Sequence, residues 1–481
     1  MKVALLLWTC IIPLCLFAQP NPDTLWTRRI GGAQQDVARG VEVTPDGGYV
    51  VVGWTCSLGD ANGDGYMVKL TGSGTQQWAR LYGGNNVDNL FDVQCLPGGG
   101  YVAAGNTRSG ISGILPDAWL IRTDTSGFSR WSQHYGDSLY NAVYSVRRTS
   151  DGNFIMAGYT GSGSSSSNDF YVVKADSGGN LRWTQVYGPA GREDVAYRVR
   201  QTPDGGYAVC GYAFINVYDF MLVRINAIGQ QIWTQYYGTA AGIERAYDLD
   251  TTADHGFVMA GSGTDPQSVS TSHPFIVRAD SAGHEVWRQL LPDTGSCYSV
   301  RALPDGSFII AGDKLIAASG RYDFYLARLS AGGSLLWSRT YRGSDESYAY
   351  AVRSTPDGGY ILCGYTLTGS DQDWFIVKTG PDHPEGITDR VTVVPSGFDL
   401  SAYPNPFNPT TTLSYVLPAT AAVSLVVYDL SGREVQRVQQ GIMTAGLHTA
   451  ILNAGAWPSG VYFARLSSGA LRKTQKILLI K

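Results

Sequence analysis

Pairs of oppositely charged residues recur along the chain at one fixed spacing, and they are the first residues whose types suggest chemistry. Six aspartates and one histidine each precede a Lys or Arg by five residues, as in Asp64 with Lys69 and Asp373 with Lys378. A carboxylate beside a cation could exchange a proton or hold a polar ligand, but a catalytic site needs one environment that differs from the others. Because the pattern recurs almost unchanged, we interpret these charges as structural pairs within or between repeated units.

A second candidate is the run Asp60-Ala61-Asn62-Gly63-Asp64-Gly65, which matches the opening of a calcium-binding loop, D-x-N-x-D-G. The oxygen atoms of Asp60, Asn62 and Asp64 are the ligands that Ca²⁺ prefers. The twelfth position, where such a loop supplies a bidentate Glu, holds Thr71. Calcium therefore competes with a solvated turn at this site, and we expect no other metal or cofactor.

The sequence contains no known catalytic motif. Its six histidines are scattered, none lies in H-E-x-x-H, and there is neither a G-x-S-x-G elbow nor a phosphate-binding loop. We therefore predict that the protein is not an enzyme.

The elements that must position these residues follow from a tryptophan that recurs about every 50 residues, at Trp26, Trp78, Trp131, Trp183, Trp233, Trp287 and Trp337. Such a period, filled with short strands, is typical of a β-propeller. Each unit holds four strand-like segments, as in Trp26–Ile30, Ala38–Thr44, Gly48–Thr55 and Asp64–Leu70, joined by tight Gly turns. We predict an all-β, seven-bladed propeller over residues 20–380.

The order of the segments predicts how the ring closes. Trp26–Ile30 stands alone before the first complete group of three strands, and the last group ends near Lys378 without a following strand. We expect Trp26–Ile30 to complete the last blade, which removes the free sheet edges.

The connections between strands differ on the two faces of the predicted ring. Uniform Gly hairpins share one face, and connections of varied length share the other, which is where binding usually resides. Trp54, Tyr212, Tyr218 and Tyr322 lie in or beside the variable connections. Exposed aromatic rings stack on sugars or peptide side chains, so these four are candidate ligand-binding residues. For Trp119 and Trp374 we favour packing between blades.

Composition and the N-terminus restrict the partners. The net charge is −4 and no Lys/Arg run exists, so we expect no nucleic-acid partner. Residues 1–19 have a basic start, a short apolar run and a small residue near the end, as a secretory signal peptide does. No segment is long enough to span a membrane as an apolar helix. Five cysteines remain after cleavage, and Cys210 and Cys363 share one repeat position, so we interpret these two as separate buried apolar residues.

The repeat pattern stops after Lys378. Residues 381–400 are rich in Pro, Gly and charge and are interpreted as a linker. Residues 401–481 contain six or seven short strand-like segments, enough for a small Ig-like β-sandwich. This segment opens with Tyr403, Pro404, Asn405, Pro406, Phe407, Asn408 and Pro409 and continues with VSLVVYDLSGREV and SGVYFARLSSG.

These motifs, in this order, resemble the type A C-terminal sorting domain of the type IX secretion system. The resemblance implies recognition by the type IX secretion machinery and a secreted or outer cell-surface location. The repeats resemble those of secreted bacterial propellers with D-G-G-Y and W-x-x-x-Y-G-G motifs, which implies the fold and no ligand.

We therefore expect a secreted or surface propeller that acts as a binding or adhesion module for an extracellular carbohydrate or protein. Two alternatives stay open. One is an extracellular polysaccharide hydrolase or lyase with its site on the variable-loop face, and the other is a structural surface component.

Overall fold

The computed structural model describes residues 22–59, 62–109, 115–137, 139–161, 168–189, 191–265, 268–382, 399–403, 405–417, 421–443, 446–469 and 471–480. The chain divides into two compact units, Met1–Gly386 and Ile387–Lys481. The predicted signal peptide and most of the predicted linker lie outside the described residues.

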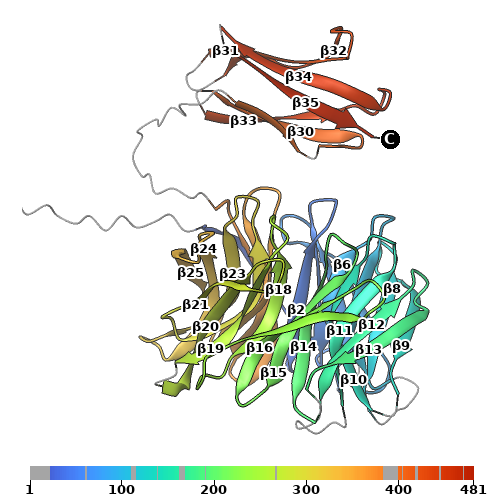
Figure 1. The fold of residues 1–481 in the computed structure, drawn as a ribbon, viewed down its shortest axis with the longest axis vertical. Coiled ribbons are helices and arrows are strands. Elements are labelled where there is room, and N and C mark those ends of the chain that lie inside the picture. Colours follow the sequence, from blue (N-terminus) through green and yellow to red (C-terminus); the bar gives the residue numbers. More distant parts are fainter. Residues whose placement is uncertain are drawn as a thin grey trace, which may run out of the picture. The chain divides into compact units, whose positions relative to one another are not determined.

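Within these residues the first unit forms seven four-stranded antiparallel sheets, which confirms the seven-bladed propeller (Figure 1). Blade 1 contains β2 (Asp36–Val43), β3 (Tyr49–Thr55), β4 (Asp64–Leu70) and β5 (Gln76–Tyr82), and blade 2 contains β6 (Asp88–Cys95), β7 (Tyr101–Thr107), β8 (Asp117–Thr123) and β9 (Ser129–Tyr135). Blade 3 contains β10 (Tyr140–Arg148), β11 (Phe154–Gly161), β12 (Asp169–Ala175) and β13 (Leu181–Tyr187), and blade 4 contains β14 (Asp194–Gln201), β15 (Tyr207–Phe214), β16 (Tyr218–Ile225) and β17 (Gln231–Tyr237). Blade 5 contains β18 (Arg245–Thr251), β19 (Phe257–Asp265), β20 (Ser268–Ala279) and β21 (Glu285–Leu290), and blade 6 contains β22 (Gly295–Ala302), β23 (Phe308–Ile316), β24 (Arg321–Leu329) and β25 (Leu335–Tyr341). Blade 7 contains β26 (Ser347–Ser354), β27 (Tyr360–Thr368), β28 (Asp371–Thr379) and β1 (Thr24–Ile30).

The ring closes as predicted. Strand β1 pairs antiparallel with β28, with Trp26 opposite Lys378 and Ile30 opposite Trp374. The first strands of the blades contact one another around the ring, from β2 through β6, β10, β14, β18, β22 and β26 back to β2. These seven inner strands therefore surround the central channel.

The repeated tryptophan packs each outer strand onto the next blade. A Cβ added to Gly127, in the outer hairpin of blade 2, would lie 2.7 Å from the Trp78 ring of blade 1. The same contact joins Gly74 to Trp26 across the closure. Gly127 also has a φ of +82°, so the position favours glycine for conformation as well as space. The Trp period therefore reflects packing between blades, and the buried Trp119 and Trp374 also belong to hydrophobic cores.

The second unit forms a small β-sandwich in the residues that the structure describes. One sheet contains β29 (Asp399–Tyr403), β30 (Thr410–Leu417) and β33 (Gly446–Asn453), and the other contains β32 (Glu434–Met443), β31 (Ala421–Tyr428), β34 (Gly460–Ser468) and β35 (Leu471–Leu479). Leu413 and Tyr415 of the first sheet share one buried core with Leu425 and Leu466 of the second. Across the described parts of both units, there is no helix with the length and apolar character needed to cross a membrane.

Candidate binding site in the central channel

Each inner strand is interrupted at the same place by an irregularity in its pairing. In β2 the register shifts between Ala38 and Gly40, so Arg39 is the extra residue. The corresponding extra residues in the other blades are Phe91, Tyr144, Tyr197, Tyr247, Tyr298 and Tyr350. A β-bulge bends its strand and re-aims side chains. Seven residues that are about 50 positions apart in the sequence therefore meet at the channel.

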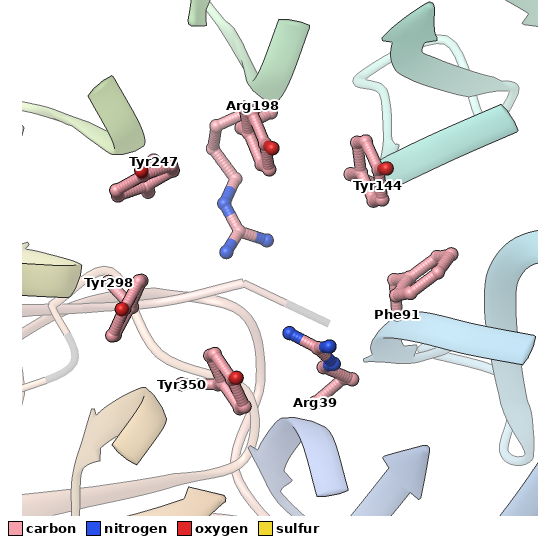
Figure 2. Close-up of a pocket in the computed structure, with 8 residues that line it drawn as sticks. Arg39, Phe91, Tyr144, Arg198, Tyr247, Tyr298 and Tyr350 are labelled. Carbon is pink, nitrogen blue, oxygen red and sulfur yellow. The ribbon is translucent and has the colours of Figure 1, made fainter. Parts of the chain in front are cut away.

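These seven residues and Arg198 line a cavity of about 370 Å³ (Figure 2). The extra residues lie near the starts of the inner strands, where the variable connections enter, so the cavity belongs to the variable-loop end of the channel. All seven are partly buried. The site is thus a concave pocket within a rigid ring, as small-ligand sites usually are.

Aromatic rings form a continuous chain around most of the cavity wall. The ring centroids are 4.8 Å apart for Phe91 and Tyr144, 4.8 Å for Tyr144 and Tyr197, 5.2 Å for Tyr197 and Tyr247, 5.2 Å for Tyr247 and Tyr298, and 5.1 Å for Tyr298 and Tyr350. Burial raises the pKa of Tyr144 to about 12 and also raises the pKa of Tyr197 and of Tyr298. These phenols are therefore neutral at physiological pH and can donate hydrogen bonds.

Arg39 completes the circle where the other six blades have an aromatic residue. Its guanidinium carbon lies 4.0 Å from the centroid of the Tyr350 ring, a cation–π contact. Its Nε is buried and has no hydrogen-bond partner among the described residues. The stacking therefore orients this guanidinium while leaving hydrogen-bonding capacity unused.

A layer of ion pairs lies directly beneath the rings. Arg198 of blade 4 contacts Asp92 of blade 2 at 3.1 Å and Asp248 of blade 5 at 2.7 Å. Burial alone would raise the pKa of Asp92, but the arginines Arg147, Arg198 and Arg353 lower it to about 2. The contact with Asp92 joins blades 4 and 2, which are not neighbours, while the contact with Asp248 joins adjacent blades, so the first extends across the channel beneath the cavity.

The same carboxylates also join adjacent inner strands. An Oδ of Asp92 accepts the backbone N–H of Val146 in the next blade at 3.1 Å, and an Oδ of Asp248 accepts that of Val300 at 3.0 Å. In blade 3, the Oγ of Ser145 accepts the backbone N–H of Val199 in the next blade at 3.4 Å. The charged layer therefore stabilises the ring in addition to forming the floor.

In the second unit, the residues of the predicted sorting motif attach to the last strand. Asn405 Nδ2 donates to Lys476 O, and Leu478 N donates to Asn405 Oδ1, both at 2.8 Å. Phe407 is buried in the core, and its N–H donates to Leu478 O at 2.9 Å. Pro406, Asn408 and Pro409 are exposed, Tyr403 ends β29, and Pro404 lies outside the described residues.

Comparison with known proteins assigns this second unit. Residues 401–481 match the family model of the secretion system C-terminal sorting domain. The chain carries a C-terminal sorting domain of the type IX secretion system. This domain directs the protein to the type IX secretion machinery and to secretion or the outer cell surface, which confirms the expected location.

Solved structures resemble the chain at low sequence identity. The type IX surface component PorZ of Porphyromonas gingivalis is 13% identical with a TM-score of 0.41, and the match covers 98% of this chain and 61% of PorZ. A puromycin hydrolase is 12% identical with a TM-score of 0.48, covering 83% of this chain and 62% of the hydrolase. An endo-arabinase from Bacteroides thetaiotaomicron is 10% identical with a TM-score of 0.32, covering 47% of this chain and 89% of the enzyme. No curated protein matches the sequence.

These likenesses concern the fold alone. This chain spans about three fifths of the length of PorZ and of the puromycin hydrolase.

None of the four predicted ligand-binding residues lines the cavity, but Tyr212 contacts its wall directly, and Tyr218 and Tyr322 connect to it through further rings. The Tyr212 ring is 5.9 Å from that of Tyr197, and Tyr218 is 5.4 Å from Tyr212. Tyr322 stacks on Tyr348 at 5.6 Å, and Tyr348 is linked through Tyr365 to the cavity wall.

Trp54 has a different role. It is partly buried at the end of β3, and its carbonyl oxygen accepts a bond from Trp374 Nε1 at 3.2 Å, which joins blade 1 to blade 7. No ring contact among the described residues joins Trp54 to the cavity.

The calcium candidate stays a prediction. Asp60 lies outside the described residues, Asn62 Nδ2 donates to Asn85 O at 3.3 Å, and Asp64 is buried at the start of β4. The described residues contain no group of three or more His, Cys, Asp or Glu side chains arranged to hold a metal ion.

The repeated bases pair differently from the predicted arrangement. Five residues along a strand span about 17 Å, so the acid and the base at its two ends cannot meet. Six of the bases instead pair with the aspartate of the inner hairpin in their own blade: Lys69 with Asp46, Lys174 with Asp151, Arg224 with Asp204, Arg278 with Asp254, Arg328 with Asp305, and Lys378 with Asp357. In blade 2 the hairpin has Gly98 at that position, and Arg122 donates to Ser177 O at 3.4 Å. Six of the seven repeated bases therefore have a hairpin aspartate as partner, which the sequence interpretation did not identify.

Sequence reasoning did not identify the cavity residues themselves. A signal was present, because an aromatic residue occupies one position of the first strand in six repeats and Arg39 replaces it in the remaining repeat. Repetition alone, however, is also what core packing produces. Only the bulges show that these side chains face the channel.

Proposed function

We propose that this secreted propeller is an extracellular binding module that takes a carbohydrate into the aromatic cavity of its channel. The observation that carries the proposal is the aromatic wall: six repeats place an aromatic side chain at the same bulged position around one pocket. Tyrosine combines a face that stacks on the apolar face of a sugar with a hydroxyl that bonds to sugar hydroxyls.

The size of the cavity favours a carbohydrate over a protein surface. Its volume of about 370 Å³ is within the range of small-ligand pockets, about 300–1,000 Å³. A stable protein interface buries about 800 Å² on each partner, much of it on flat surface. The cavity suits one or two sugar units of a longer chain.

The charges beneath the cavity favour binding over catalysis. A glycosidase needs one carboxyl group that is protonated at its working pH. Arginines hold the pKa of Asp92 at about 2 and also lower that of Asp248, against the effect of burial, so neither can supply a proton.

One observation favours the hydrolase alternative. Burial raises the pKa of Asp313, which lies within strand β23, to about 7. A group with such a pKa could act as an acid near Tyr298. Release of reducing ends from a bound glycan, abolished in Asp313→Asn, would support a hydrolase.

Binding of the full secreted protein to a glycan array and a protein array tests the proposal. We expect binding to glycans, weakened at least about tenfold in a Tyr197→Ala/Tyr298→Ala variant, because truncation of buried aromatic contacts typically has effects of this size. The matched control is Tyr236→Ala, since Tyr236 is exposed on outer strand β17 of the same blade as Tyr197. Glycan binding that the double variant leaves unchanged, or no glycan binding, contradicts the proposal.

A further inference from the structure

We infer that the bound carbohydrate is anionic, with a carboxylate on its terminal sugar as in a uronic acid, and that Arg39 recognises that carboxylate. This inference rests on the proposed function and names its ligand class. It starts from the one blade that departs from the aromatic pattern. In blade 1 the residue that lines the cavity at this position is Arg39, whereas the other six blades have an aromatic residue there.

Positive charges outnumber negative charges in and beneath the cavity. Beneath the rings, four arginines other than Arg198 face four carboxylates: Arg147, Arg200, Arg301 and Arg353 against Glu42, Asp92, Asp248 and Asp250. These eight charges balance. With Arg39 and Arg198 added, six guanidinium groups outnumber the four carboxylates by two, and of the two that line the cavity only Arg39 has no ion pair with a described carboxylate. In a pocket walled by rings, where water is limited, their field attracts an anion.

The two arginines differ in what they can still bind. Arg198 directs Nε toward Asp248 and Nη1 toward Asp92. Arg39 is held by stacking on Tyr350, and no described carboxylate forms an ion pair with it. In Figure 2 the guanidinium groups of both side chains extend into the cavity. The planar N–H fork of Arg39 matches a planar carboxylate, which it can bind through two parallel hydrogen bonds.

The closed floor determines which part of the glycan enters. Because the ion pair of Arg198 with Asp92 joins blades 4 and 2 across the channel, it blocks the path of a polysaccharide through the ring. A chain end can enter, with its ring against the tyrosines and its carboxylate at Arg39. The inference therefore concerns a terminal uronic acid.

The test compares charged and neutral forms of the same glycan. Isothermal titration of the full secreted protein uses a panel of uronic acid trisaccharides and their methyl esters, in which the carboxylate is masked. We expect the best acid to bind at least about tenfold more tightly than its ester, the usual scale for a charge-assisted contact. Arg39→Gln should remove that preference and leave ester binding within about twofold, while Arg39→Lys retains part of it.

A matched control keeps the net charge equal to that of Arg39→Gln. Arg182 is exposed on outer strand β13 and pairs with Asp176, so Arg182→Gln removes one positive charge far from the inner strands and should leave the preference unchanged. Circular dichroism verifies that each variant is folded.

The outcomes separate this inference from the proposed function. Equal binding of acids and esters, both lost in Tyr197→Ala/Tyr298→Ala, overturns the inference and leaves the carbohydrate function standing. No binding of either form, together with no neutral glycan on the array, overturns both. Tighter binding through Arg39 of a sulfated trisaccharide, or of a peptide with a free rather than an amidated C-terminus, overturns the assignment to a uronic acid.

Discussion

Asp248 is the carboxylate on which the charged layer of the channel depends most, and Asp248→Asn tests that dependence. Its side chain is fully buried. Oδ2 accepts bonds from Ser299 Oγ at 2.9 Å, Val300 N at 3.0 Å and Arg301 Nη1 at 2.6 Å, and Oδ1 lies 2.7 Å from Arg198 Nε. Asparagine has nearly the same shape but no charge, so the change isolates the electrostatic contribution.

The expected loss follows from the arginines that remain. Breaking a buried ion pair by removing one charge destabilises a protein by about 3–5 kcal/mol, because the other charge stays buried without compensation. Here Arg198 and Arg301 both lose a carboxylate at short range. We therefore expect the free energy of unfolding of the propeller to fall by about 3–5 kcal/mol at pH 7.

The pH dependence of the free energy of unfolding independently checks that the charge of Asp248 stabilises the folded state. Burial would raise the pKa of Asp248, but Arg198, Arg301 and Arg200 lower it well below its ordinary value of 3.8. The stability supplied by this carboxylate is thus fully present above pH 3.8 and is lost as the pH falls toward the lower pKa of the folded state. The difference between wild type and Asp248→Asn should therefore narrow as the pH falls below that value.

Urea unfolding followed by tryptophan fluorescence and by circular dichroism measures the effect, provided that the two probes give one transition. Asp345→Asn is the control, since Asp345 pairs with Arg321 on the surface and its loss should leave the unfolding midpoint unchanged. A change of less than about 1 kcal/mol for Asp248→Asn at pH 7 would refute the reasoning, because only a solvated surface pair is expected to contribute so little.

Two further substitutions test other parts of the propeller. Gly98→Asp supplies blade 2 with the hairpin carboxylate that the other six blades have, and a Cβ at this position meets no atom within 4 Å. We expect urea unfolding to show that this variant is more stable than the control Gly98→Ala by about 0.5 kcal/mol. Equal stability of the two variants would contradict a stabilising role for the pair. Asp313→Asn removes a buried carboxyl whose pKa burial raises from 3.8 to about 7. Because the folded state favours the protonated form of Asp313, the free energy of unfolding of the wild type falls by about 4 kcal/mol as the pH rises from 3.8 to 7. In Asp313→Asn this contribution to the pH dependence of the free energy of unfolding should be absent, as unfolding measured from pH 4 to 8 would show. Parallel slopes for the two proteins would contradict the burial argument, and Asn106 at the matching position of blade 2 shows that asparagine fits there.

The sequence contained the architecture because the architecture depends on local patterns that repeat. Trp78 and Gly127 recur with the blade period, since every blade packs on the next in the same way. The isolated strand Trp26–Ile30 predicted the closure with β28, because seven outer strands need seven partners. The motif around Phe407 identified the sorting domain, since its residues lie close together in the chain.

The candidate site depended on the tertiary structure for a physical reason. Arg39 and Tyr350 are in contact across the ring closure although more than 300 residues separate them in the chain. Their orientation toward the channel depends on bulges, which shift the strand alternation by one residue and leave no clear mark in the sequence. Likewise, the sequence showed that Lys69 recurs with an acid five residues away, but only strand pairing showed that Asp46 in the hairpin neutralises it. The sequence by itself therefore determined the number of blades, the closure and the sorting domain, while the tertiary structure decided which charges are paired and that Arg39 stacks on Tyr350 in the wall of the channel.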